Sequence, residues 1–134
     1  MDTLRRTLYL QAGVWAIAGI ALAAVPEWLL PHLFGQPFRL SREVAWIRLL
    51  GIESLGLSML MVLVAHRVEE LWWWSWAFAM VNVAFAAIVV LNAGFGLEEH
   101  ESRIFWWTFS GVAVAFALGM LYGLFVSSRE QPIP

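Results

Sequence analysis

The stretch IFWWTFSGVAVAFALGMLYGLFVSS, residues 104–128, decides the fold, because it runs for 25 positions without a charged side chain. An α-helix needs about 20 apolar residues to cross the hydrocarbon core of a bilayer. Two more uncharged stretches, residues 7–26 and 71–97, contain 20 and 27 residues. A fourth stretch, residues 44–65, is also long enough, although it carries two charged side chains. The sequence therefore predicts four transmembrane helices.

The composition of the 134 residues agrees with this prediction. Hydrophobic residues make up 61% of the chain and charged residues 13%, whereas soluble domains average about 45–50% and about 25%. A small soluble domain must cover itself with polar surface, so a soluble enzyme or a disordered chain does not fit these values. The formal net charge of −2 supplies no positive field for gathering nucleic acid, and we expect no nucleic-acid partner.

The fold class that we predict is all-α, an integral membrane four-helix antiparallel bundle that forms one domain over residues 1–134. The predicted helices cover about residues 7–25, 44–66, 71–92 and 104–126. Residues 26–38 contain three prolines and are too short to span, so we expect an interfacial segment with Trp28 and Leu30 in the headgroup region. The first apolar run is longer than that of a signal peptide, and we expect it to be retained as a helix.

Arginine and tryptophan positions give the expected orientation. With the N-terminus inside, four arginines are cytoplasmic (Arg5, Arg6, Arg67 and Arg129) and three are outside (Arg39, Arg42 and Arg103). This small excess, together with the arginine pair before the first helix, favours cytoplasmic termini at both ends of the chain. The tryptophans suit the two membrane interfaces, and we expect Trp72, Trp73 and Trp74 at the inner one.

Small residues recur on three of the predicted helices at spacings that place them on one face. The fourth helix carries them strictly four apart, at Gly111, Ala115, Gly119 and Gly123. The first helix has Ala12, Ala16, Gly19 and Ala23, and the second has Gly51, Ser54 and Ser58. Such faces predict tight helix packing. The face on the fourth helix can serve packing within the chain or contact with another subunit.

Glu53 is the most informative single position. It lies nine residues into the second predicted helix, about 13 Å from its outer end at 1.5 Å per residue. An acid at this depth is costly and is usually turned inward and used. Asn82 falls at a similar depth on the next helix, so the two side chains could hydrogen-bond across the hairpin. The carboxyl group could act in a proton relay or cation site, or it could simply hold the second and third helices together.

Arg48 is the other charge on the second helix. It lies five residues from Glu53, which separates the two by about 140° around the helix and is a poor arrangement for a direct ion pair. Arg48 could extend to the outer headgroups, or it could clamp a lipid phosphate or another anion. Three further polar residues in the membrane, Gln11, Thr108 and Ser110, are expected to hydrogen-bond between helices.

The residues needed for most chemistry are missing from the sequence. The chain has no cysteine, which excludes disulfides, iron–sulfur clusters and covalently attached haem. Its three histidines, His32, His66 and His100, lie outside the predicted apolar core, which argues against a haem held by axial histidines. Nucleophile, nucleotide-binding and zinc-hydrolase motifs are absent from the sequence. We therefore predict no catalytic residue, no metal site and no cofactor.

Several segments together resemble the DoxX-like group of small bacterial membrane proteins. They are residues 9–15 (YLQAGVW), Pro26 after the first helix, residues 46–51 (WIRLLG) and residues 55–57 (LGL). The resemblance covers most of the chain as architecture. It implies four helices in a bacterial inner (cell) membrane, and it implies no catalytic residues.

Three functions fit these features. The first is an accessory or assembly subunit of a membrane complex, or a protein that binds lipid or another hydrophobic ligand. The second is a small proton- or cation-coupled transporter that uses Glu53, in which a homodimer would have to supply the pathway because one bundle is too small. The third is a membrane enzyme on a hydrophobic substrate with Glu53 as acid and base. The expected partners are membrane lipid and other membrane subunits or a second copy.

Overall fold

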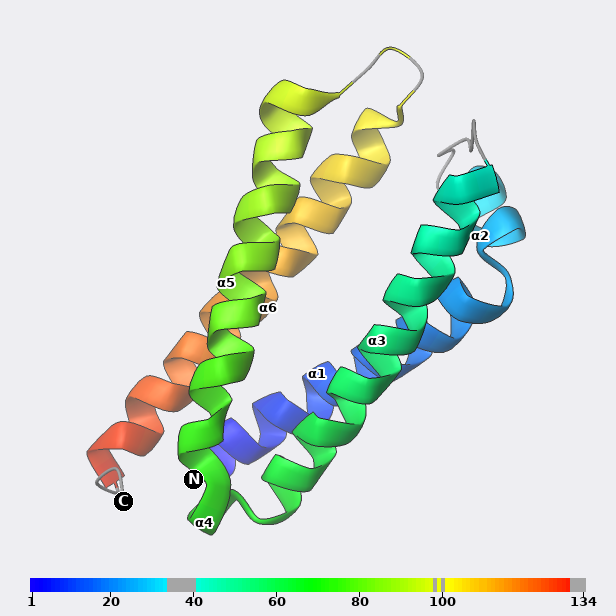
Figure 1. Ribbon diagram of the computed structural model, residues 1–134. Helices are drawn as coiled ribbons and strands as arrows, with labels where there is room; N and C mark the ends of the chain where they lie inside the picture. The colour runs from blue at the N-terminus through cyan, green and yellow to red at the C-terminus, as the bar shows by residue number, and fades with distance from the viewer. Residues whose placement is uncertain (34–40, 98, 100, 131–134) are drawn as a thin grey trace.

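Four long helices dominate the computed structural model, which describes residues 1–33, 41–97, 99 and 101–130. They are α1 (Asp2–Ala24), α3 (Ser41–His66), α5 (Ser75–Leu91) and α6 (Arg103–Glu130). In Figure 1, α1 lies beside α3 and α5 beside α6, and consecutive long helices run in opposite directions. The part of the chain that the structure describes is all-helical, with four spans long and apolar enough to cross a membrane.

The helices extend beyond the predicted boundaries at several ends. α1 starts at Asp2 rather than near residue 7, and α6 continues to Glu130 rather than stopping near residue 126. A helix can carry charged residues in its last turns once these leave the apolar region, so the first charge marks the end of a hydrocarbon span and not the end of the helix.

Short helical segments connect the long ones. α2 (Pro26–Leu33) begins on a proline, whose missing N–H costs nothing in a first turn. Leu30 of α2 is buried in the protein rather than turned to headgroups as expected, whereas Trp28 is exposed. The rest of the predicted interfacial segment, residues 34–38, lies outside the described residues.

Between α3 and α5, the chain forms α4 (Val68–Leu71) and the 3-10 helix η1 (Trp72–Trp74). After α5, a π-helical turn, η2 (Asn92–Gly96), ends the span.

Glycines bring α1 and α3 into backbone contact. A Cβ added at Gly19 would lie 2.7 Å from the carbonyl oxygen of Gly51, and one added at Gly51 would lie 2.6 Å from the backbone nitrogen of Ala23. Real Cβ atoms essentially never come this close to backbone atoms. The small faces predicted for these two helices therefore pack against each other within the chain, as small residues do in membrane helix pairs.

The main core lies at the end of the molecule that holds both chain termini, called the terminal end below (Figure 1). All four long helices contribute to it, with α4 and η1: Leu4, Leu8, Ala12, Met61, Val64, Ala65, Val68, Trp72, Phe78, Ala79, Met120 and Leu124. Trp72 is thus a core residue and not the interfacial anchor that we expected, although Trp73 and Trp74 are exposed. Towards the other end the two helix pairs diverge, and a second, smaller cluster of Ala86, Ala113 and Ala117 joins only α5 to α6.

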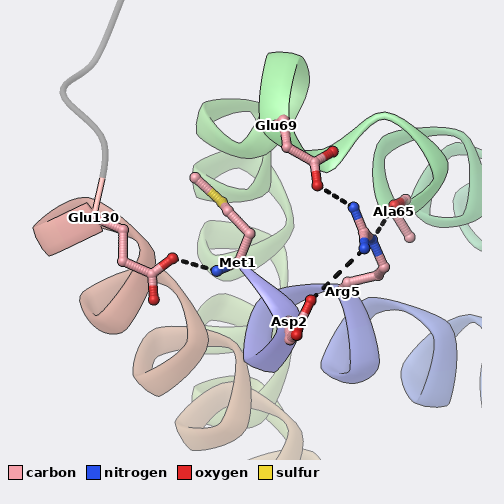
Figure 2. Close-up of polar contacts among 6 residues, drawn as sticks. All are labelled: Met1, Asp2, Arg5, Ala65, Glu69 and Glu130. Carbon is pink, nitrogen blue, oxygen red and sulfur yellow. Dashed lines mark hydrogen bonds and ion pairs between the residues drawn. The ribbon is translucent and has the colours of Figure 1, made fainter.

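Polar contacts tie the chain ends to the loop between α3 and α5, as Figure 2 shows. The N-terminal amino group pairs with Glu130 at the end of α6, and Arg5 pairs with Glu69 of α4. Arg5 also donates from Nε to the Ala65 carbonyl oxygen at 3.3 Å, one of the last carbonyls of α3 that has no partner in its own helix. These exposed ion pairs contribute little energy individually; they mark which helix ends lie side by side.

The contact between Gly19 and Gly51 can be tested with alanine substitutions. G51A is expected to lower the free energy of unfolding by about 1–3 kcal/mol, because the added methyl group forces two backbones apart. G13A is the matched control, since a Cβ at Gly13 meets nothing within 4 Å. Denaturation of the detergent-solubilised protein, followed by tryptophan fluorescence, measures both variants. Equal stability of G51A and G13A would show that the close contact is wrong.

Candidate functional site

Glu53 lies at the middle of α3, on the outside of the molecule. It is 12 residues from the first residue of α3 and 13 from the last, or about 18 and 20 Å at 1.5 Å per residue. Its side chain is exposed. Gly51, two positions earlier, is buried against α1, and two residues correspond to about 200° around a helix. Because Gly51 faces inward, Glu53 must face away from α1.

A row of exposed residues runs along α3 on either side of Glu53. Its members alternate at spacings of three and four, and all are exposed: Trp46, Leu49, Glu53, Gly56, Leu60 and Leu63. We call this row the Glu53 stripe. It is apolar apart from the Glu53 carboxyl group and the indole N–H of Trp46 near one end, and a Cβ added at Gly56 would meet nothing within 4 Å. Spacings of three and four are those of a helix seam that packs against another helix.

The hydrogen bond considered between Glu53 and Asn82 is not formed. Asn82 is 3% exposed and lies inside the molecule, where its Nδ2 donates to Oε1 of Gln11 at 3.0 Å. Gln11 in turn donates from Nε2 to the Phe116 carbonyl oxygen of α6 at 2.8 Å. This buried amide pair joins α1, α5 and α6. Asn82 therefore has a structural partner on α1, while Glu53 has no hydrogen-bond or ion-pair partner in the described part of the chain.

The other polar residues in the spans have local partners or face outward. Gln11 makes the predicted contact between helices, whereas the Ser110 hydroxyl donates to the Trp106 carbonyl oxygen of its own helix and Thr108 is exposed. Arg48 approaches Glu27 of α2, with 3.4 Å between Nη2 and Oε1. Both side chains of this pair are largely exposed, so it contributes little to stability. As its spacing predicted, Arg48 does not pair with Glu53.

The row of small residues on α6 is divided between two environments. Near the terminal end, Gly123 contacts Leu4, and Gly119 lies against Gln11 and Thr7 of α1. Towards the other end, Ala115 is exposed, and a Cβ on Gly111 would meet nothing within 4 Å. Internal packing, one of the two uses considered for this face, accounts for half of it.

Aromatic rings connect α1 with the α5 and α6 pair. Trp15 of α1 contacts Phe85 of α5 and Phe116 of α6 edge to face, with ring centroids 5.5 and 6.2 Å apart. Phe85 continues to Phe109, 5.4 Å away. These edge-to-face contacts link the two helix pairs. They add modest energy beyond that from burying the apolar surface of the rings. They do not reach the Glu53 stripe, which lies on the outer side of α3.

Within the described ranges, groups of three or more metal-ligating side chains are not found. Comparison of the chain with protein-family models, with curated proteins and with solved structures finds no match. The resemblance to the DoxX-like group stays a prediction.

A double-mutant cycle distinguishes the observed partner of Asn82 from the predicted one. The variants Q11A and N82A should show a coupling free energy of about 0.6 kcal/mol, and up to about 1.7 kcal/mol, as hydrogen bonds between membrane helices do. The pair E53A and N82A should be additive, because these residues share no contact. Denaturation in mixed micelles gives the free energy of unfolding of each variant. Coupling of Asn82 to Glu53 and not to Gln11 would overturn the described geometry.

Proposed function

We propose that this chain is a small integral membrane protein that works as an accessory or assembly subunit. Its four long helices would be inserted as an antiparallel bundle in a bacterial inner membrane, with both termini in the cytoplasm. The Glu53 stripe of α3 would bind a transmembrane helix. The observation that carries the proposal is the exposure of Glu53 at the middle of an otherwise apolar helix face.

Lipid is a poor neighbour for Glu53. A charged side chain near the bilayer centre costs about 2.5–3.5 kcal/mol on insertion scales. A neutral carboxyl group also has an O–H donor and a carbonyl acceptor that hydrocarbon cannot satisfy. A second helix that presents a polar group at the same depth removes this cost. Polar side chains bind membrane helices together for this reason.

The competing functions find less support in the geometry. A lipid headgroup lies at the membrane surface, about 18 Å along the helix from Glu53, so Glu53 would not recognise it. A transport pathway or an enzyme pocket would need walls around the carboxyl group. Since Glu53 lies outside the bundle, another subunit would have to supply those walls, and both alternatives therefore include the same helix contact.

Site-specific photocrosslinking in native membranes tests the proposal. A benzophenone amino acid replaces Leu60 of the Glu53 stripe or, as the control, Leu118 of α6, which is similarly exposed. We expect a protein adduct from position 60 and only lipid adducts from position 118. E53L should reduce the adduct about five- to thirty-fold, since a lost interhelical hydrogen bond costs about 1–2 kcal/mol.

E53Q provides the matched variant, because an amide keeps both a donor and an acceptor, and it should retain most of the adduct. E53L should not lower the unfolding midpoint, since Glu53 makes no hydrogen bond or ion pair within the described part of the chain. Equal yields from positions 60 and 118, or a yield unaffected by E53L, would refute the proposal.

A further inference from the structure

We infer that the partner on the Glu53 stripe is a second copy of this chain in the same orientation, with the two Glu53 carboxyl groups hydrogen-bonded to each other. This inference rests on the proposed function and names the partner. Four features of α3 support it: the residue spacing of the stripe, its single carboxyl group, the open glycine beside it and its length.

The spacing of the stripe is compatible with a parallel helix pair. Counting heptads from Trp46, Glu53 and Leu60 share the first position, while Leu49, Gly56 and Leu63 share the fourth. In a parallel pair of helices with this seam, each first-position residue packs against its own counterpart. Copies that share an orientation in the membrane also carry residue 53 at equal depth. Glu53 of one copy therefore meets Glu53 of the other.

A neutral carboxyl group is its own complement. It has one O–H donor and one carbonyl acceptor, so two facing groups satisfy each other with two hydrogen bonds and leave nothing unpaired. Apart from Trp46, whose indole N–H lies near the first end of α3, the stripe contains no other polar side chain that would need a different partner. A twofold interface requires self-complementary surfaces, and one carboxyl group in an apolar row meets that requirement.

The glycine next to Glu53 permits the close approach that the pair needs. Gly56 lies three residues from Glu53 on the same stripe, and the space beyond its Cα is open. Small residues let membrane helices approach closely. The stripe extends from Trp46 to Leu63, about 26 Å of helix, which is close to the hydrocarbon thickness of about 30 Å. The seam therefore extends through most of the membrane.

Energy transfer between labelled copies in liposomes tests the inference. Because the natural chain has no cysteine, a single S128C substitution, at an exposed position of α6, takes either the donor or the acceptor dye. Dilution with lipid gives the association constant. We expect the wild type and E53Q to associate, and E53L to associate about ten-fold more weakly.

A charge exchange between copies makes the test specific. E53K alone should not associate, because two lysines repel, whereas E53K mixed with wild-type protein should associate through a Lys–Glu pair. G56L should block association, and G13L is its matched control, since both glycines face open space and both variants should fold. Failure of the mixed E53K sample to associate, or unchanged association of both E53L and G56L, would overturn the inference.

The photocrosslinked adduct separates this inference from the proposed function. An adduct at twice the 15.2 kDa mass of the chain supports both. A different protein can instead form the adduct in a Glu53-dependent way, while purified copies show no energy transfer. This outcome keeps the proposed function and overturns the second copy as partner. Absence of both an adduct and energy transfer overturns both.

Discussion

The contact between Gly19 and Gly51 determines which face of α3 packs inward and which face is exposed. Because two backbones meet there, α3 cannot rotate about its axis without forcing a Cβ or a larger side chain into α1. The buried face of α3 then carries Ser54, Ser58 and Met61 towards the interior. Glu53 has no inward position available, since it lies about 200° around the helix from Gly51. Glu53 is therefore exposed because of how α3 packs against α1.

The polar residues of the spans fall into two groups. Gln11 and Asn82 are buried and satisfy each other together with the Phe116 carbonyl oxygen, so their role is complete within the chain. Glu53 is the opposite case, a carboxyl group whose hydrogen-bonding capacity the described residues leave unused. A buried satisfied group stabilises one fold, whereas an exposed unsatisfied group specifies a neighbour.

Much of the architecture could be predicted from the sequence. Charge-free stretches predict four spans because a charged side chain is costly in hydrocarbon, and four helices of suitable length are present. The partner of Asn82 could not be predicted. The depth of a residue in the membrane does not show which other helix packs against its side chain. Gln11 is 71 positions away in sequence. The direction of Glu53, by contrast, was available from the small residues at positions 51, 54 and 58, which mark the packed face of the same helix.

The separation of the molecule into two helix pairs has a consequence for the order in which the chain assembles during synthesis. The contact of α1 with α3 needs only the first half of the sequence, so this pair can close early. The core at the terminal end also needs Met120 and Leu124, which the ribosome adds near the end. Until then, the Gln11 amide lacks its Phe116 acceptor, and an amide left unsatisfied away from water is unfavourable. The last helix therefore completes contacts that the first helix has left open throughout translation.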